Sequence, residues 1–433
     1  MAMRAVFREL IALTQEDGQL IPTRRRAPLD SFDTESDEMT FINAFVDARL
    51  LVRESATVEV AHEAILRHWE ELKGWIERIK GDLALYRQYE RDAKTWDERG
   101  RDAPPPSHEA LVYFYAALEN LDLERDALPE PLLSYTAPEA GRLLQELVEL
   151  ATTAETEGRR RDIGDRLAVI SDPREGIGVK DGLPDMLWLP VTGSNGAKIA
   201  FPETDWSGND DGTWGEFAVA DFFIAKYLTT YEQYQAFVSA EDGYQNKLWW
   251  QDFPEQYQPQ ELSEQRTKSP NNPRDRLSWY QSVAFGRWMT LQFAGLELEH
   301  PSGDILRVGD NAEIRIPTEW EWQWAAMNGS EKWKYPWGAW EVGHANMNES
   351  GLGRAIAVGM YPHGEAVCGA LDMSGNLYEW CANNHDDPEV IDTSNTSSKV
   401  LRGGSSISVG MVRGRPSATV TVLTSVATTA VVV

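Results

Sequence analysis

The stretch RIPTEWEWQWAA, residues 315–326, decides the fold of the second half of the chain. Its Thr318 is followed three residues later by Glu321, which is the spacing of a capping box. In a capping box the Thr hydroxyl accepts a hydrogen bond from the backbone amide of the Glu, and the Glu carboxylate accepts one from the backbone amide of the Thr. The spacing therefore predicts a helix that begins directly after Thr318.

The sequence on both sides of this helix is typical of an irregular α+β domain. Residues 171–196 are rich in Gly, Asn and Pro, and the aromatic and β-branched runs that follow predict strands within 183–191 and 217–230. Hydroxyl side chains at the right places predict two more capped helices. These are 229–241, capped by Thr229 or Thr230, and 277–293, capped by Ser278.

The first half of the chain is helical in character, because apolar residues recur three and four positions apart. A short strand is expected only at the start of 56–79, and consecutive prolines at 104–106 interrupt the helical pattern. The predicted helical stretches are 3–15, 41–52, the later part of 56–79, 82–102, 109–121 and 138–170. The predicted domains are a first segment at 1–80, a helical region or linker at 81–175, and the α+β domain at 176–433.

Composition and charge exclude several classes of protein. The 433 residues carry a formal net charge of −28 and have a pI near 4.7, which argues against binding to nucleic acid or to an anionic membrane surface. Only two cysteines are present, and the N-terminal stretch lacks the continuous apolar run of a signal peptide. No window of the sequence is apolar over the length of a membrane span. We expect a soluble, cytoplasmic protein.

Short motifs follow one another in a fixed order through the second half of the chain. They are RIPTEWEWQWAA, YPWG (335–338), ANMN (345–348), LDMSGNLYEWCAN (371–383) and LRGGS (401–405). In this order and spacing they resemble the formylglycine-generating-enzyme family. The resemblance covers about 185–418 and implies a C-type lectin fold. The expected fold class is therefore α+β, with a helical, winged-helix-like N-terminal region followed by a C-type lectin fold domain of the formylglycine-generating-enzyme type.

The N-terminal segment carries a second resemblance, in FINAFVDARLLV (41–52) and VEVAHEAILRHWEELKGWI (58–76). These residues are similar to the winged-helix segment that follows the ATPase core in STAND-class signalling NTPases. The chain has no G-x-x-x-x-G-K-[ST] loop to hold phosphates, so we expect no nucleotide cofactor and no nucleotide hydrolysis. The resemblance implies an adaptor at 1–80 that contacts a signalling partner. A plain helical domain is the alternative.

The chemistry of the two catalytic branches of the resembling family is missing from the sequence. The first branch uses a copper-binding pair of cysteines just after the GGS motif, where this chain reads SISVGMV (406–412) and has no thiol. Cys368 and Cys381 are expected to be small core residues. The second branch needs a three-histidine iron site, but the seven histidines are scattered, and His62 and His68 fall on different faces of a helix. We expect no copper and no enzymatic activity.

The motif DMSGNLYEW (372–380) predicts a structural calcium site. Asp372 and Glu379 flank a turn, and two carboxylates together with turn carbonyls are the hard oxygen ligands that Ca²⁺ prefers. The ligands that the resemblance implies are the side chains of Asp372 and Glu379 and the carbonyls of Gly375 and Leu377. The alternative is that the two carboxylates only cap the turn through backbone hydrogen bonds.

The residues after LRGGS follow a different composition rule from the rest of the chain. Thr, Ser, Val, Ala, Ile and Gly dominate 406–433, and these residues arise when the adenines of an AAC codon are replaced. In this respect the chain resembles the variable proteins of diversity-generating retroelements, with a variable region at about 405–433. The resemblance implies a surface that binds a protein or a small molecule. Its predicted ligand-binding residues are Ser406, Ile407, Ser408, Val409, Met411, Val412, Thr419, Thr421, Thr424 and Ser425.

Two observations leave other interpretations of this tail open. The run ATVTVLTSVATTAVVV (418–433) is rich in β-branched residues and also predicts a buried terminal strand. Variable proteins usually end in Gly-Phe-Arg, which this chain lacks. A non-catalytic, ligand-binding variable protein is the favoured function. The alternatives are a formylglycine-generating-enzyme-like oxidoreductase with an altered active site, and a structural or regulatory signalling adaptor.

Overall fold

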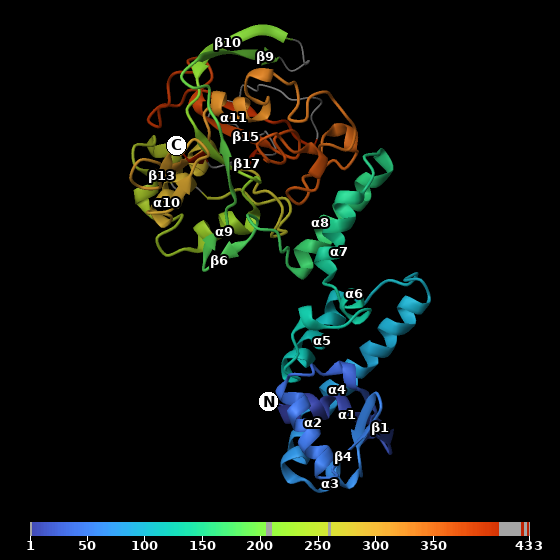
Figure 1. Cartoon of the computed structure of the whole chain (residues 1–433). Coiled ribbons are helices and arrows are strands. Elements are labelled where there is room, and N and C mark those ends of the chain that lie inside the picture. Colours follow the sequence, from blue (N-terminus) through green and yellow to red (C-terminus); the bar gives the residue numbers. More distant parts are fainter. Residues whose placement is uncertain (1, 205–209, 259–260, 407–425, 428–430, 433) are drawn as a thin grey trace. The chain divides into compact units, whose positions relative to one another are not determined.

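The computed structural model describes residues 2–204, 210–258, 261–406, 426–427 and 431–432 (Figure 1). The chain divides into two compact units, Met1–Arg142 and Leu143–Val433. The divisions near residues 80 and 175 stay predictions. Within the described ranges, no helix combines the length and the apolar composition that a membrane crossing requires.

The first unit combines helices with short strands. Its helices are α1 (Ala2–Leu10), α2 (Asp37–Asp47), α3 (Ala64–His68), α4 (Glu70–Glu98), α5 (His108–Asn120) and α6 (Leu132–Tyr135), and α7 (Glu139–Glu149) spans the division. Its strands are β1 (Ile11–Glu16), β2 (Gln19–Arg24), β3 (Ala27–Pro28), β4 (Leu51–Glu54) and β5 (Thr57–Val60), arranged as the hairpin β1–β2 and the sheet β3–β5–β4. Phe7, Leu83 and Phe114 lie in one buried core that joins α1, α4 and α5.

The hairpin β1–β2 corrects the helix that the sequence predicted over 3–15. The helix ends at Leu10, and residues 11–16 pair antiparallel with residues 19–24. The turn between the strands is Asp17–Gly18, with φ angles of 48° and 78°. An Asp-Gly pair with positive φ at both residues is typical of a type I′ two-residue hairpin. This turn outweighs the helical spacing of a short apolar segment.

Two other predicted helices are shorter than the sequence indicated. The end of 41–52 is not helical, because β4 begins at Leu51 and pairs with β5. The stretch 138–170 divides into α7 and α8 (Glu157–Ile170). Between them Thr156 donates its hydroxyl to the carbonyl of Ala151 at 2.7 Å. Such local side-chain bonds compete with helix continuation.

The second unit mixes helices with many short strands, as expected for 176–433. Its helices are α8, α9 (Tyr231–Ser239), α10 (Trp279–Gln292) and α11 (Glu319–Ala326). Its strands are β6 (Val179–Lys180), β7 (Leu183–Pro184), β8 (Trp188–Val191), β9 (Lys198–Thr204), β10 (Asp210–Ala218), β11 (Phe222–Ala225), β12 (Glu297–Glu299), β13 (Ile305–Arg307), β14 (Ile314–Arg315), β15 (Tyr378–Asn384), β16 (Lys399–Arg402), β17 (Val426–Ala427) and β18 (Val431–Val432). They form the sheets β14–β18–β11–β8 and β16–β15–β17 and the pairs β6–β7, β9–β10 and β12–β13.

Capping boxes open α9, α10 and α11, which confirms the three predicted helix starts. Thr230, not Thr229, caps α9. Each box satisfies two backbone amides that the first helical turn would leave unpaired, and loss of such a cap costs about 1 kcal/mol. The boxes pair Thr230 with Gln233, Ser278 with Gln281, and Thr318 with Glu321.

Helix α10 fixes the position of β15 in the core of the second unit. The Trp279 indole nitrogen donates to the carbonyl of Cys381 at 2.9 Å, and the Trp380 indole nitrogen donates to the carbonyl of Leu277 at 3.0 Å. Each tryptophan thus buries a large apolar surface while its polar atom is satisfied. The strand cannot shift along the helix without breaking both bonds, so the turn that precedes β15 is held in place.

Helix α8 is bonded to the segment 354–361 of the same unit. A Cβ on Gly164 would lie 2.8 Å from the Cβ of Ala357, so this close approach requires glycine. Side chains of the two elements are also paired. Arg354 donates to Asp165 at 2.6 Å, and the Tyr361 hydroxyl donates to the buried Glu157. The helix that leads into the second unit is therefore part of its packed structure.

Short strands close to the C-terminal end of the sequence enter two sheets. Strand β17 runs parallel to β15 (Figure 1). Strand β18 lies between β14 and β11. These four residues have the extended pairing that the terminal-strand interpretation predicts. Residues 407–425, 428–430 and 433 lie outside the described part of the chain.

Candidate functional site

Two predicted motifs meet where β15 begins and β16 ends. The strands pair antiparallel with Glu379 opposite Arg402, and the Gly375 amide donates to the Gly403 carbonyl at 3.0 Å. Both glycines have φ near +90°, a backbone conformation that side chains with a Cβ rarely adopt. We call the two connected turns, residues 371–376 and 402–406, the double turn.

Asn376 connects the double turn to the surrounding segments. It is fully buried, and its Oδ1 accepts hydrogen bonds from the Ile356 amide at 3.0 Å and from the Asn346 side chain at 3.1 Å. Its carbonyl accepts from the Ser406 amide at 3.2 Å. The start of the predicted variable region is thus fixed to the scaffold through one asparagine.

Two carboxylates, Asp372 and Glu379, are buried beside the double turn. Asp372 accepts from the Gly359 amide at 2.7 Å, and Glu379 accepts from the Trp322 indole at 2.9 Å. Burial raises the pKa of Asp372 to about 6 and that of Glu379 to about 8, although these hydrogen bonds oppose the shift. The ionised form of each carboxyl is therefore disfavoured unless a positive charge joins it.

The surroundings of Glu379 fit the predicted calcium ligands in part. A Cβ on Gly403 would lie 3.5 Å from the carbonyl oxygens of Leu377 and Met373 and 3.6 Å from the Glu379 carboxylate. Three hard oxygen donors therefore border one small space that no side chain of residue 403 fills. One oxygen of Asp372 is already bonded to an amide. This donor chemistry suits Ca²⁺.

Arg402 anchors the other half of the double turn. Its guanidinium donates to the carboxylate of Glu319 and, at 2.8 Å, to the side-chain oxygen of Gln323, both on α11. All three side chains are buried. A buried arginine needs such partners, since an unpaired charge in the interior is strongly unfavourable. This ion pair explains why the motif RGGS begins with an arginine.

Ser406 is the only predicted ligand-binding residue that falls within the described residues. It is 5% exposed and lines a small pocket of about 20 Å³. The other predicted residues lie outside the described part: Ile407, Ser408, Val409, Met411, Val412, Thr419, Thr421, Thr424 and Ser425.

The pocket beside Ser406 is polar, and we call it the Asn272 pocket after the residue at its wall. Its volume of about 20 Å³ is enough for one or two water-sized groups. Its lining includes Gln265, Asn272, Asp275, Arg354, Leu377 and Ser406. They come from the loop before α10, the segment 354–361, the double turn, and Leu377 directly before β15.

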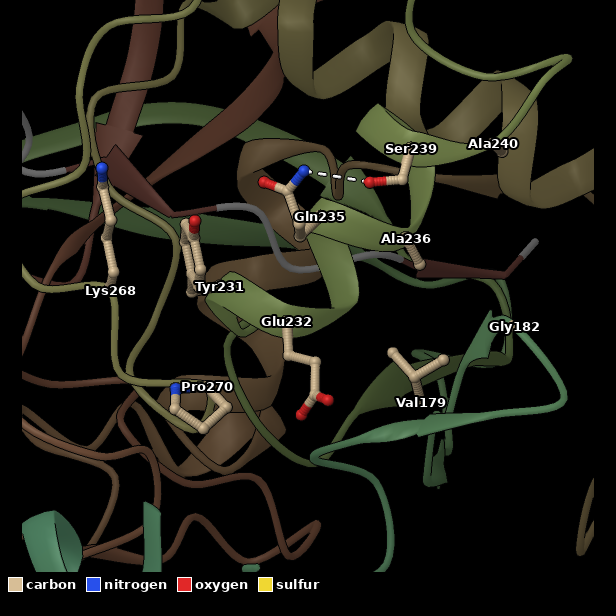
Figure 2. A pocket seen from close by; sticks show the side chains of 10 residues that line it. All are labelled: Val179, Gly182, Tyr231, Glu232, Gln235, Ala236, Ser239, Ala240, Lys268 and Pro270. Carbon is tan, nitrogen blue, oxygen red and sulfur yellow. Dashed lines mark hydrogen bonds between the residues drawn. The ribbon is translucent and has the colours of Figure 1, made fainter. Parts of the chain in front are cut away.

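A larger groove lies along α9 (Figure 2) and has a volume of about 590 Å³. It is bordered by Val179 and Gly182 of the β6–β7 region, by one face of α9, and by Lys268 and Pro270. Along α9, the Gln235 side chain donates to the Ser239 hydroxyl at 3.1 Å (Figure 2). The groove has the size of a small-molecule site. The sequence analysis placed no site residue there.

The cysteines and histidines are the other candidate reactive groups among the described residues. Cys381 lies in the core and Cys368 packs against it partly buried, as the sequence predicted. Burial raises the pKa of both thiols, which disfavours the reactive thiolate. His344 and His363 lie 6.0 Å apart between ring centroids, a proximity that their sequence spacing did not indicate. Within the described ranges, no three side chains of His, Cys, Asp or Glu are grouped to hold a metal ion.

Two features of this region were not anticipated from the sequence. The pair of Arg402 with Glu319 joins residues 83 positions apart, and although both lie in motifs, nothing in the sequence indicated that they pair. Asn272 stands in the stretch NNPRD (271–275), where nothing distinguished it from its neighbour Asn271. The signal for Asn272 is its unused hydrogen-bonding capacity, which requires the structure.

Two family models match the sequence. Residues 193–423, more than half of the chain, match the sulfatase-modifying factor enzyme 1-like domain. Residues 1–104 match the family Novel STAND NTPase 1. These two matches agree with the resemblances to the formylglycine-generating-enzyme family and to STAND-class NTPases that the motifs indicated.

Similar proteins with a described activity match only in part. A hercynine oxygenase of Mycolicibacterium thermoresistibile is 27% identical over 184 residues, which are 37% of this chain and 35% of that protein. A formylglycine-generating enzyme of Thermomonospora curvata is 25% identical over 229 residues, which are 42% of this chain and 65% of that protein. The chain thus spans about a third of the first relative and just under two thirds of the second.

Among solved structures, Treponema denticola variable protein 1 is 17% identical, with a TM-score of 0.39. The match covers 56% of this chain and 94% of that protein.

Proposed function

The chain belongs to the sulfatase-modifying factor enzyme 1-like domain family, and from this premise we propose that it is a non-catalytic, ligand-binding variable protein. Its second unit would use a C-type lectin fold as a scaffold. The binding surface would begin at Ser406 and continue through the variable region, about 405–433. Its ligand would be a protein or a small molecule.

The observation that carries this proposal is a change of composition at the end of a fixed turn. Arg402 is held by Glu319, Gly403 by Gly375, and Ser406 by Asn376. Directly afterwards the sequence becomes rich in the residue types that adenine replacement yields. A rigid scaffold that ends where sequence variation begins is the arrangement that a diversified binding surface needs, because loops tolerate change better than the core does.

The state of the cysteines supports a non-catalytic role. Copper-dependent oxidation of a cysteine needs thiolates as metal ligands and redox partners. In this chain Cys381 is buried and Cys368 is partly buried, and burial raises the pKa of each. The formylglycine-generating-enzyme-like alternative would therefore need other residues to supply the chemistry.

The N-terminal unit suggests how binding would be transmitted. Residues 1–104 match a family of STAND NTPases, while the sequence has no phosphate-binding loop. We propose that this region is an adaptor for a signalling partner. The second function to consider, a purely structural or regulatory adaptor, rests on this observation alone.

A calcium ion fits the same scaffold as a structural element. The side chains of Glu379 and Asp372 and the carbonyls of Leu377 and Gly375 would hold it, and the Met373 carbonyl lies nearby. Bound there, the ion would neutralise buried carboxylates and stiffen the double turn.

Sequencing of the DNA around the coding region tests the proposal most directly. We expect a reverse-transcriptase gene and a near-copy of the last coding segment that differs from it at adenines. Absence of both from the complete replicon would refute diversification by a retroelement.

A catalytic assay tests the non-enzymatic part separately. The purified full chain, loaded with copper and given a cysteine-containing peptide and oxygen, should form no formylglycine. A formylglycine-generating enzyme assayed in parallel is the positive control. Turnover by this chain that is lost in Cys368→Ser or Cys381→Ser would favour the oxidoreductase instead.

A further inference from the structure

The Asn272 pocket contains a buried carboxamide with unused hydrogen-bonding capacity. Asn272 is 1% exposed, and its backbone is bonded on both sides, to the Ser269 carbonyl at 3.1 Å and to the Tyr231 amide at 2.7 Å. Among the described residues, neither its Nδ2 nor its Oδ1 has a hydrogen-bond partner. Burying such a group without partners is unfavourable, and most buried polar groups in proteins are paired.

The neighbouring Asn271 shows how the same side chain is used structurally. It is equally buried, and its Nδ2 donates to the Gly164 carbonyl at 3.1 Å and to Asp172 at 3.0 Å. Its Oδ1 lacks a partner in the described structure, but the two donated bonds tie the loop to α8 and to Asp172. Asn272 makes no comparable side-chain bond, so it contributes nothing of this kind to the fold.

Two of the three charged residues that line the pocket, Arg354 and Asp275, are already paired, and the third, Arg266, is exposed. Arg354 donates to Asp165 at 2.6 Å. Asp275 lies 3.8 Å from the Arg274 guanidinium, and it accepts from the Arg266 amide at 3.4 Å. A charged guest would disturb these pairs and would satisfy only one half of the Asn272 carboxamide. A neutral planar group that both donates and accepts satisfies both halves at once.

We propose that the Asn272 pocket recognises a carboxamide group of the ligand, held by the side chain of Asn272 beside Ser406. This inference rests on the proposed ligand-binding function and deepens it. It assigns a fixed recognition element to the scaffold, next to a surface whose other residues vary. The volume of about 20 Å³, enough for one or two water-sized groups, admits the terminal oxygen and NH₂ of a carboxamide and little else.

Fragment binding to the full chain tests the pocket. We expect ligand-observed NMR to detect acetamide binding in the millimolar range, and no binding of acetate or N,N-dimethylacetamide, which lack a neutral donor. N-acetylglutamine methylamide is the second probe. Tighter binding of this probe than of acetamide indicates a glutamine side chain of a protein ligand, and equal or weaker binding indicates a free small amide.

Variants at two adjacent positions separate recognition from folding. Asn272→Leu removes the unpaired carboxamide at similar volume, so acetamide affinity should fall about ten-fold or more while the melting temperature stays equal or rises. Asn271→Leu is the matched control and should lower the melting temperature while it leaves acetamide binding intact. If Asn272→Leu does not fold, Asn272→Asp retains the shape and should also lose acetamide.

Absence of acetamide binding to the folded chain would overturn the inference, and so would unchanged binding in the Asn272 variants. A melting temperature that falls as far in Asn272→Leu as in Asn271→Leu would identify Asn272 as a structural residue instead. These outcomes are distinct from a failure of the proposed function, which is decided by the neighbouring DNA and not by the pocket.

Discussion

Glu321 and Glu379 are carboxylates that lie buried in the same unit, yet their environments have opposite effects. Glu321 receives two hydrogen bonds from Arg315, at 2.8 and 2.9 Å, and one from the Thr318 amide at 2.7 Å, and its pKa is lowered. Glu379 receives a bond from a neutral indole, and burial raises its pKa to about 8. Burial itself acts in the same direction on both.

The difference between the two lies in what compensates the charge. An arginine in the fold makes Glu321 a permanent part of the α11 start, whatever the solution contains. Burial raises the pKa of Glu379 to about 8, so its protonated form, or its carboxylate bound to a cation from solution, is favoured. Above about pH 5 the contribution of Glu321 to stability should therefore be insensitive to pH, whereas that of Glu379 should vary with pH.

Breaking the compensated pair should have the largest effect. Arg315→Met leaves Glu321 buried without its cation, and loss of one partner from a buried pair costs about 3–5 kcal/mol of unfolding free energy. Urea denaturation of the full chain measures this. Arg307→Met is the control, because its partner Glu297 and Arg307 itself are about half exposed, and such pairs contribute about 0–1 kcal/mol. Equal losses in the two variants would contradict the comparison.

The raised pKa of Glu379 should make stability depend on pH. Between the ordinary pKa of 4.5 and the folded value of about 8, the folded chain keeps a proton on Glu379 that the unfolded chain has released. The unfolding free energy should therefore fall as pH rises through this window, by up to about 1.4 kcal/mol per pH unit in calcium-free buffer. Below this window the penalty is absent, and above it the penalty is complete.

Glu379→Gln removes this dependence while it keeps an acceptor for Trp322. Measured against wild type from pH 5 to pH 8, the variant should gain relative stability with every step upward. Glu297→Gln, at a half-exposed position, should follow wild type throughout. Parallel curves for Glu379→Gln and wild type would mean that Glu379 does not titrate as its burial indicates.

Calcium should replace the proton at the second site. At pH 8, Ca²⁺ at a hundred times its dissociation constant should raise the unfolding free energy by about 2.7 kcal/mol, and thermal melting detects this as a higher midpoint. Asp372→Asn and Glu379→Gln should weaken the response, and Mg²⁺ is the control for general ionic effects. If calcium has no effect and Asp372→Ala leaves stability unchanged, the calcium proposal is wrong.

The smallest expected loss of unfolding free energy follows from breaking the capping box that pairs Thr318 with Glu321. Thr318→Ala removes the hydroxyl that accepts from the Glu321 amide but leaves Arg315 in place. We expect a loss of about 1 kcal/mol in urea denaturation. Thr95→Ala, at an exposed position within α4, should be neutral or slightly stabilising. A larger loss of unfolding free energy in Thr318→Ala than in Arg315→Met would contradict the conclusion that the ion pair contributes more than the cap.

Local sequence patterns predicted the helix starts well, because a capping box depends on residues three positions apart. Thr230, Ser278 and Thr318 all cap the helices that were expected there. The predicted helix over 3–15 was wrong beyond Leu10, although the Asp17–Gly18 pair was a readable signal for a hairpin. Where an apolar stretch is short, its spacing alone does not distinguish helix from strand.

The candidate site was predictable only where its residues share a motif. The motifs placed Asp372, Glu379 and the RGGS turn near a functional region, and the β15–β16 pairing brings them side by side. The partner of Arg402 and the unpaired state of Asn272 depend on contacts between distant segments. No local pattern encodes such contacts, so they required the folded structure.

The bonds between helix α8 and the segment 354–361 decide where the domain can be cut without losing stabilising contacts. A fragment that starts at residue 176 would lack Gly164, Asp165 and Glu157, so Arg354 and Tyr361 would lose their partners and Ala357 would face solvent. A recombination event that transfers the sulfatase-modifying factor enzyme 1-like domain to another protein would thus have to include residues from about 157 onward. The segment that must be inherited as one piece is therefore longer than the stretch that carries the recognisable motifs.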